Sequence, residues 1–273
     1  MAAEQRLIYQ ITDSHVPASG TLFGKVDSFA YLLQALAQIE AAPERPDVLI
    51  LSGDVADGGL PSEYDKVAEV VSAAAARLHA KVCYLPGNHD KRDAFRSLLG
   101  GADPICQSFM VGGLRIVALD STVEGEVYGE LTNDQLEWLQ DTLANPAEEG
   151  TLLALHHPPI RLPIPVETLM GLRNPEQLER AIAGTDVVLV VAGHVHHASA
   201  GLLGEIPVWI SAAGAYSQDA LAGADIMRGL RGSGFTRIDI ASGRAIATHV
   251  PLRTSDDVLW EYTLAAAQAD LLG

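Results

Sequence analysis

Short apolar runs alternate with segments of helical periodicity over the first two hundred residues of the chain. The runs are continuous rather than alternately apolar and polar, which is typical of strands covered on both faces. We expect six such strands, at residues 7–11, 48–51, 82–85, 116–119, 152–155 and 187–191. Strands of this kind with helices between them predict a single α/β domain.

Three helices are expected between these strands. Thr132 opens one of them with a capping-box pattern, and Ser62 after Pro61 is the expected cap of a helix that ends at Leu78. The first helix spans 26–39 and has an apolar face made of Phe29, Leu32, Leu33, Leu36 and Ile39.

The last third of the chain has a different pattern. Two pairs of apolar runs, 198–203 with 208–210 and 235–240 with 244–250, flank short turns and predict hairpins. From Ser255 onward the pattern favours a final helix. We therefore expect one α/β domain over 1–252 and a helical tail over 253–273.

Composition and charge restrict the function. The chain has 273 residues, of which 48% are hydrophobic, and a formal net charge of −17. Such a charge disfavours nucleic-acid polymers and anionic membrane surfaces as partners. No secretory leader or run of about 18 apolar residues is visible, and Cys83 and Cys106 lie in apolar segments. These features predict a cytosolic protein with reduced cysteines.

Polar side chains follow five of the predicted strands directly. Because ligands bind at the carboxyl ends of strands in an open α/β sheet, we expect these side chains to form one site. They are Asp13 and His15, Asp54, Asn88 and His89, His156 and His157, and His194 with His196 and His197.

Seven of these residues form a plausible set of metal ligands. Seven exceed what one tetrahedral ion takes, but they suit two divalent ions if one carboxylate bridges. The mixture of nitrogen and oxygen donors favours Mn, Fe, Zn or Co over Ca. Glycines immediately before Asp54, Asn88 and His194 would allow close backbone approach. The set is Asp13, His15, Asp54, Asn88, His156, His194 and His196.

Each of these short motifs on its own has an ordinary structural explanation. Asp-x-His, Asn-His and Gly-His-x-His sequences are common in turns and loops. Five of them in this order, each at the end of a strand, are rarely a coincidence.

The five motifs together resemble the calcineurin-like metallophosphoesterase family over roughly residues 7 to 250. The resemblance implies a four-layer α/β/β/α sandwich with mixed sheets and C-terminal hairpins. It places Asp13, His15 and His196 on one ion, and Asn88, His156 and His194 on the other, with Asp54 as the bridge. His89 would face the phosphate and act as the catalytic proton donor or as a stabiliser of charge.

Four further residues receive supporting roles. Asp57 and Asp90 are candidates for orienting the residues that contact metal or substrate. For Asp57, an exposed turn residue without such a role is an equal alternative. His157 and His197 adjoin ligands and would point away from them on an extended segment. They are retained as candidate substrate contacts.

Within the family, the chain looks most similar to class III cyclic-nucleotide phosphodiesterases and the related glycerophosphodiesterases. Supporting sequences are His156-His157-Pro158-Pro159 and Tyr216-Ser217-Gln218-Asp219. This similarity implies hydrolysis of small phosphodiesters, 3′,5′-cyclic AMP above all, by attack of a hydroxide that bridges two ions roughly 3.5–4 Å apart. The alternatives are a glycerophosphodiesterase, a broad-specificity diesterase that accepts 2′,3′-cyclic nucleotides, and, more remotely, a non-catalytic metal-binding scaffold. Relatives are often dimers, so a homodimer is expected.

Overall fold

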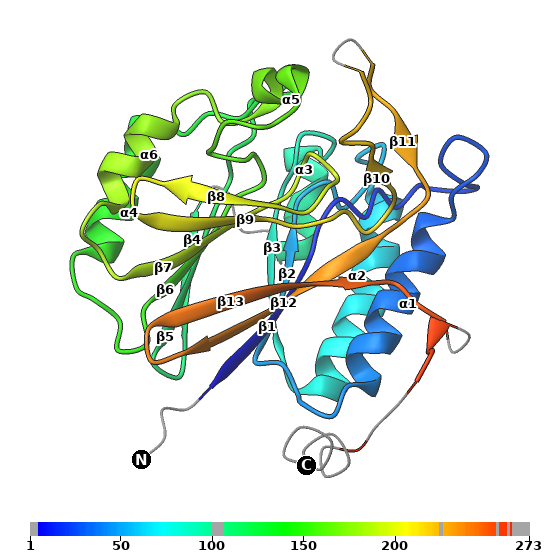
Figure 1. The fold of residues 1–273 in the computed structure, drawn as a ribbon, viewed down its shortest axis with the longest axis horizontal. Helices are drawn as coiled ribbons and strands as arrows, with labels where there is room; N and C mark the ends of the chain where they lie inside the picture. The colour runs from blue at the N-terminus through cyan, green and yellow to red at the C-terminus, as the bar shows by residue number, and fades with distance from the viewer. Residues whose placement is uncertain (1–4, 100–105, 224–225, 255–256, 261–262, 264–273) are drawn as a thin grey trace, which may run out of the picture.

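The computed structural model describes residues 5–99, 106–223, 226–254, 257–260 and 263. Two mixed β-sheets lie face to face, and helices cover the outer face of each sheet (Figure 1). The arrangement confirms the expected four-layer α/β/β/α sandwich.

The first sheet has the strand order β13-β12-β1-β2-β3. Strands β1, β2 and β3 are parallel, whereas β12 and β13 form an antiparallel hairpin whose inner strand pairs with β1. Helices α1 (Ser28–Ala41) and α2 (Pro61–Leu78) cover its outer face. The strands are β1 (Arg6–Ile11), β2 (Val48–Ser52), β3 (Lys81–Leu85), β12 (Gly234–Ala241) and β13 (Arg244–Pro251).

The second sheet has the strand order β4-β5-β6-β7-β9-β8. Its four central strands are parallel, and an antiparallel strand pairs at each edge. Helices α4 (Asn133–Leu143) and α6 (Pro175–Ile182) cover its outer face. The strands are β4 (Cys106–Val111), β5 (Leu114–Leu119), β6 (Thr151–Ala154), β7 (Val187–Ala192), β8 (Ser199–Leu203) and β9 (Ile206–Ile210).

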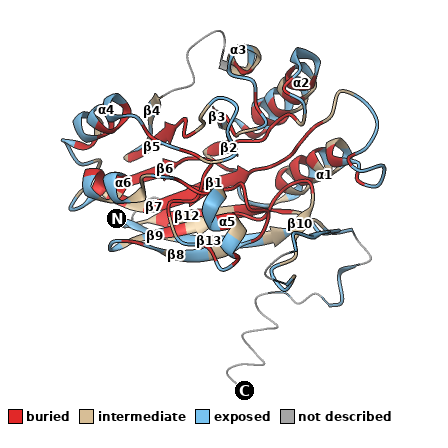
Figure 2. Ribbon diagram, turned by 90° about the horizontal axis from the view of Figure 1, so that it is seen from above, coloured by how far each residue is buried: buried red, intermediate tan, exposed pale blue. Residues whose placement is uncertain are grey.

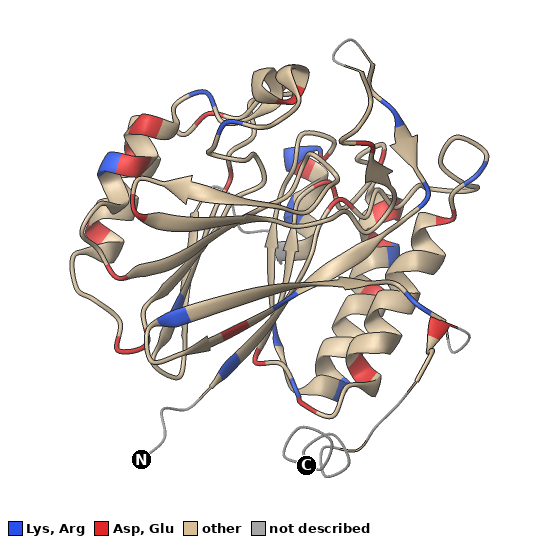
Figure 3. Cartoon of the chain, in the orientation of Figure 1, with Lys and Arg blue, Asp and Glu red and all other residues tan. Residues whose placement is uncertain are grey.

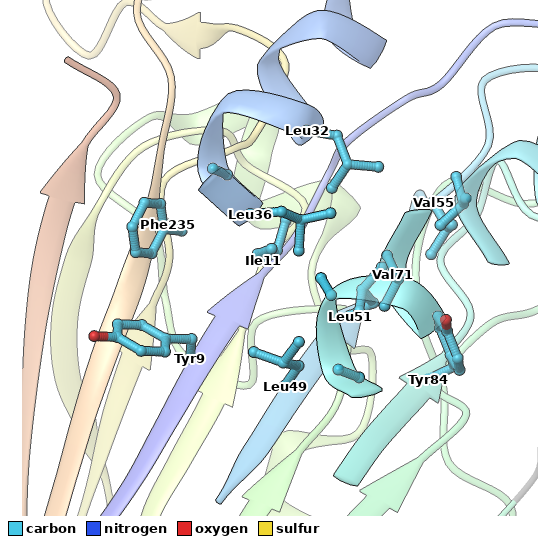
Figure 4. Packing of buried hydrophobic residues seen from close by; sticks show 14 of the residues in the cluster. Tyr9, Ile11, Leu32, Leu36, Leu49, Leu51, Val55, Val71, Tyr84 and Phe235 are labelled. Carbon is cyan, nitrogen blue, oxygen red and sulfur yellow. The ribbon is translucent and has the colours of Figure 1, made fainter. Parts of the chain in front are cut away.

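Three hydrophobic clusters hold the four layers together. One packs α1 and α2 on the first sheet and includes Leu36, Leu51 and Val71 (Figure 4). A second lies between the two sheets, and a third packs α4 and α6 on the second sheet. Strands β1, β2, β5 and β6 are therefore buried along their whole length, as the continuous apolar runs predicted (Figure 2).

The helix predictions hold with local corrections. Thr132 caps α4 through the expected capping box with Gln135. Ser62 does not cap α2, because Pro61 already occupies the first helical turn and Leu60 is the N-cap residue. Leu33 does not belong to the buried face of α1, where Ala35 is buried instead.

Both predicted hairpins are present. β8 pairs with β9, and β12 pairs with β13 through a turn at Ser242 and Gly243. Strand β9 begins at Ile206 and includes Pro207, so it starts two residues earlier than expected. The expected C-terminal helix lies mostly outside the described residues. Of the described part, Val258, Leu259 and Trp260 are exposed and carry no helix.

Four short elements lie on the connections: α3 (Arg92–Phe95), α5 (Pro165–Met170), β10 (Ser217–Gln218) and β11 (Gly229–Leu230). The 3-10 helix Arg96–Leu99 follows α3. Cys83 is buried, Cys106 is partly buried, and both are free cysteines. None of the helices in the described residues is long and apolar enough to cross a membrane.

Candidate metal centre

The candidate ligands lie where five parallel strands end. Asp13 and His15 follow β1, Asp54 follows β2, and Asn88 follows β3. His156 follows β6, and His194 and His196 follow β7. Because β1–β3 and β6–β7 belong to different sheets, the site forms between the carboxyl edges of the two sheets, in the upper middle of the view in Figure 1.

Left-handed backbone conformations concentrate at this site. Among the described residues other than glycine, eight have positive φ, and five of these are candidate ligands. Such conformations are uncommon for residues with a Cβ and collect at functional sites, where the surrounding fold holds them in place. The five are Asp13, His15, Asp54, His194 and His196, with φ between 40° and 75°.

Two glycines let the loops of the site approach closely. A Cβ on Gly53 would lie less than 3.0 Å from the His156 ring, and one on Gly87 would lie equally close to the Asp54 carboxylate. Gly53 also has a φ of +94°, which a residue with a side chain rarely adopts. The glycines before Asp54 and Asn88 thus permit the close approach that the sequence predicted.

One group of candidate ligands combines a carboxylate with two imidazoles. Asp13, His15 and His196 each offer a ligand atom, and these atoms lie within 4.8 Å of one another. The Nε2 atoms of His15 and His196 are 3.1 Å apart, and His196 Nε2 is 3.4 Å from Asp13 Oδ1. His196 Nδ1 donates to the Tyr216 carbonyl at 3.0 Å, which leaves Nε2 directed to the group.

A second group contains buried atoms that have no hydrogen-bond partner among the described residues. They are Asn88 Oδ1, His156 Nε2 and both ring nitrogens of His194. His156 Nδ1 donates to the Ser52 carbonyl at 2.8 Å, so the free nitrogen is again Nε2. Buried polar atoms are normally paired, so this cluster points to a bound ligand.

Asp54 lies between the two groups. Its Oδ2 is 3.5 Å from His15 Nε2, and its Oδ1 is 3.6 Å from His156 Nε2. One carboxylate oxygen therefore faces each group, while the backbone N–H of His89 donates to Oδ1 at 2.8 Å. This placement is the one a bridging carboxylate requires.

The electrostatics favour anionic carboxylates and at least one neutral histidine. Burial raises the pKa of Asp54, but the nearby His156 and His15 outweigh it and hold the pKa well below the ordinary value. Burial lowers the pKa of His194, and His156 lowers it further, to about 3. His194 is therefore neutral at pH 7, which is the form that binds metal.

These residues fit a pair of divalent ions. The donors are imidazole nitrogens, carboxylates and one amide oxygen, and the unpartnered atoms of the second group would gain a partner. Thiolates are absent from the described clusters, so the donor set differs from that of structural zinc sites.

His89 lies at the rim of the site. Its side chain is 44% exposed, and its ring packs edge-on against His15 with centroids 4.6 Å apart. Its Nδ1 donates to the backbone carbonyl of Asp57 at 3.0 Å, whereas the Asp57 carboxylate is 3.9 Å away. Asp57 thus orients His89 through its backbone, and its side chain lies closer to His15 Nδ1, at 3.4 Å.

Asp90 ties together the loops that carry Asp54 and Asn88. Its buried carboxylate accepts hydrogen bonds from the backbone N–H groups of Val55, Ala56 and Gly87 and from the hydroxyl of Tyr64. Burial and the neighbouring Asp54 raise the pKa of Asp90 to about 7, although the backbone donors oppose this.

His157 was expected to point away from the ligands, but its ring lies against them. Its ring centroid is 4.7 Å from that of His194, and its Nδ1 bonds Ser121 Oγ at 2.8 Å. The residue that follows a strand in a tight turn no longer alternates in direction, so the extended-segment argument fails here. His157 and its neighbours His156 and His194 form a further cluster of possible ligand atoms.

His197 does point away from the candidate ligands. It contacts Glu167, a residue that the sequence did not indicate. Its Nε2 is 2.9 Å from Glu167 Oε2, and its Nδ1 is 2.9 Å from Ser199 Oγ. Glu167, from α5, is 1% exposed and lines the cavity over the ligands. No local motif surrounds Glu167, because its partner lies thirty residues away.

Tyr216 is the other residue that the sequence did not assign to the site. Its ring centroid lies 4.3 Å from that of His196 and 6.1 Å from that of His15. Burial and the nearby Asp13 raise its pKa to about 12, so the hydroxyl stays neutral. A cavity of about 150 Å³ lies over the ligands and is lined by His89, Asn88, His194, Glu167 and Tyr216, among others.

Comparisons with known proteins agree with this geometry. The family model described as calcineurin-like phosphoesterase matches residues 6–198. A probable cyclic nucleotide phosphodiesterase from Rhodococcus erythropolis is 36% identical, covering 91% of this chain and 84% of that protein. A cAMP/cGMP dual specificity phosphodiesterase from Mycobacterium tuberculosis is 35% identical, covering 92% and 81%. A probable glycerophosphodiester phosphodiesterase, GpdQ, from Arcobacter nitrofigilis is 30% identical, covering 76% and 77%.

Proposed function

The chain belongs to the calcineurin-like phosphoesterase family, and from this premise we propose that it hydrolyses 3′,5′-cyclic AMP to 5′-AMP at a dinuclear metal centre. The observation that carries the proposal is the position of Asp54, with one carboxylate oxygen toward each of two ligand groups. The names of the two most similar relatives reported above support a cyclic-nucleotide substrate.

The proposed ligands divide into two sets that share Asp54. Asp13, His15 and His196 would hold one ion, and Asn88, His156 and His194 would hold the other. When bound, two divalent ions lower the pKa of a water molecule and neutralise charge on the phosphoryl group. The donor set suits Mn, Fe, Zn or Co.

His89 is the proposed catalytic acid. A water molecule that gives up one proton to solvent attacks phosphorus in line with the ribose 3′ oxygen, the bond from phosphorus to that oxygen breaks, and the leaving oxygen takes a proton. His89 Nδ1 is held by the Asp57 carbonyl, so Nε2 is the atom free to supply that proton. General acid catalysis of this kind contributes about 10²–10⁴-fold to the rate.

The local charge suits a small anion despite the net charge of −17. Asp13 and Asp54 contribute two negative charges, and two divalent ions contribute four positive charges. The balance at the site would be about +2, enough to attract a singly charged diester. In Figure 3 basic and acidic residues mix along helices and connections, and no basic stripe for a long polyanion is visible in this view.

A glycerophosphodiesterase is the second candidate, because a relative at 30% identity carries that name. The two activities separate in a direct assay of the metal-loaded protein with 3′,5′-cyclic AMP, 2′,3′-cyclic AMP and glycerophosphocholine. We expect the highest kcat/KM for 3′,5′-cyclic AMP and 5′-AMP as its product. A higher kcat/KM for glycerophosphocholine would overturn the proposal, and a metal-loaded protein inactive on all three would point to a scaffold.

Three further properties stay predictions. They are a homodimer in solution, a cytosolic location, and a division into a catalytic domain over 1–252 and a tail over 253–273. Sedimentation analysis of the purified chain tests the first. Limited proteolysis followed by mass spectrometry tests the third.

A further inference from the structure

A second and larger cavity adjoins the small one over the metal ligands. Its volume is about 430 Å³, within the range of roughly 300–1,000 Å³ typical of small-molecule sites. The two cavities share Tyr216, Gln218 and Met227 as lining residues. We propose that this larger cavity, here called the base groove, binds the purine base of the cyclic nucleotide. The inference rests on the proposed function and extends it by assigning the part of the substrate that does not react.

The small cavity cannot hold the whole substrate. At about 150 Å³ it has room for a phosphoryl group next to the ligands but not for a whole nucleotide. The remainder of the substrate must therefore extend into adjoining space. The base groove opens from the side of the small cavity that Tyr216 lines.

Aromatic side chains line the base groove. The Tyr216 ring lies between the metal ligands and Phe23, with its centroid 4.3 Å from that of His196 and 5.3 Å from that of Phe23. A purine base in the groove would meet both rings, and bases stack well on aromatic faces. Because Tyr216 lines both cavities, a base in the groove would lie next to the proposed phosphate position.

Phe23 has an exposed ring that a ligand in the base groove would cover. Its side chain is 73% exposed and its φ is +54°, on the loop between β1 and α1. Large apolar side chains with this exposure and this backbone conformation are uncommon and often mark a binding site. Met227, just before β11, and Leu230, on β11, are also exposed and line the same groove.

The charges of the base groove favour a neutral base over a cationic headgroup. Lys25 and Arg231 line it, and none of its described lining residues is Asp or Glu. Figure 3 shows basic residues both on the loop before α1 and near β11, although acidic residues outnumber basic ones by 35 to 18 in the chain. Two cations would repel the quaternary ammonium of glycerophosphocholine, which aromatic rings alone would attract.

The cavity on the other side of His89 has a different character. It is lined by Asp57, Lys91 and Glu126, among others, so it presents two carboxylates, whereas the base groove has none among its described lining residues and is lined by exposed apolar side chains. This contrast assigns the base to the groove of Phe23 and Tyr216.

The test compares two phosphomonoesters that differ only in the base. The inhibition constants of 5′-AMP and ribose 5-phosphate are measured against hydrolysis of bis(p-nitrophenyl) phosphate, a reporter that does not require activity on cyclic AMP. Phe23→Ala should raise the inhibition constant of 5′-AMP roughly tenfold, because one stacking partner is lost. The constant of ribose 5-phosphate should stay within about twofold. Phe23→Trp should restore binding of 5′-AMP.

Ile246→Ala is the matched control, because Ile246 is 65% exposed on β13 and lines neither cavity. It should change neither constant. Equal effects of Phe23→Ala on both inhibitors, or no effect on 5′-AMP, would overturn the inference. A change of oligomeric state in Phe23→Ala would do so too, because the exposed side chains would then be a contact with a second copy of the chain. Absence of cyclic AMP hydrolysis by the wild type is a different result, which refutes the proposed function instead.

Discussion

Single residues at the candidate metal centre occupy conformations that the chain would not adopt without a reason. Five candidate ligands have positive φ, namely Asp13, His15, Asp54, His194 and His196. This conformation destabilises the fold by on the order of 1 kcal/mol or more for each residue with a Cβ. The same five residues place imidazole or carboxylate groups toward one another across two sheets. Functional constraint therefore outweighs local stability at the ends of β1, β2 and β7.

Asp54→Ala should remove both metal ions, because one carboxylate oxygen faces each ligand group. The measurement is metal content per chain by elemental analysis after loading and desalting. Glu137→Ala, an exposed carboxylate on α4, should retain the wild-type stoichiometry. Two ions bound by Asp54→Ala would contradict the bridging assignment.

His89→Ala should keep both ions and lower kcat by about 10²–10⁴-fold, because a proton donor at the rim is lost while the ligands stay. Asp57→Asn should lower kcat much less, because the backbone carbonyl that accepts the hydrogen bond from His89 is retained. Steady-state kinetics with metal analysis of each variant separates the two. Unchanged turnover in His89→Ala would exclude it from the reaction.

The sequence predicts the residues of the site better than their surroundings. Strand ends, glycines and metal-binding residue types were enough to bring Asp13, Asp54, Asn88 and His156 to one place. The direction of His157 was wrong because it depends on the geometry of a turn. Glu167 was missed because its partner His197 is near only after folding.

At the scale of elements, the site depends on a small number of contacts between a helix and two turns. Tyr64 of α2 donates its hydroxyl to Asp90 and accepts from the backbone N–H of Lys91. Asp90 in turn accepts from the backbone at Val55, Ala56 and Gly87. The turns after β2 and β3 are thereby fixed to the helix that covers the first sheet.

Asp90→Asn should destabilise the fold more than Tyr64→Phe. In Asp90→Asn an amide N–H₂ replaces a carboxylate oxygen that accepts two hydrogen bonds, so two buried donors lose their acceptor. Each unsatisfied donor lowers the free energy of unfolding by about 1–3 kcal/mol. Tyr64→Phe removes one hydroxyl bond and leaves the Lys91 N–H unpaired, a loss of about 1–2 kcal/mol. Urea unfolding of both metal-free variants gives the free energies. Equal free energies of unfolding for the two variants would show that Asp90 does not link the turns.

The elements differed in how well the sequence predicted them. Strands β1, β2 and β6 were found because burial on both faces leaves only apolar residues in them. β4 was missed because it is an edge strand with partly exposed, mixed residues that pairs with β5 alone. Helix α6 was missed because it is short, with eight residues of which Pro175 is the first.

At the scale of the whole molecule, the candidate metal centre lies between the two sheets. β1 and β2 of the first sheet and β6 and β7 of the second contribute ligands to the same cluster, whose polar atoms are buried. A hydrogen bond from Gln10 to the Ala192 carbonyl adds a further link beneath it. The chain has few basic residues, and no lysine or arginine among the described residues contacts the buried carboxylates of the candidate ligands. Bound cations would therefore offset the negative charge of these carboxylates.

Removal of the ions by a chelator should therefore lower the Tm of the whole domain. Ions that bind only the native state stabilise it by about 4 kcal/mol each at a thousandfold excess over Kd. For a domain of this size that corresponds to a shift on the order of 10 °C per ion. Differential scanning calorimetry before and after chelation measures the shift, with elemental analysis to verify removal. Asp54→Ala should show little further change with chelator, because it holds no ions. A wild-type Tm that survives complete removal would mean that the hydrophobic layers alone join the two sheets.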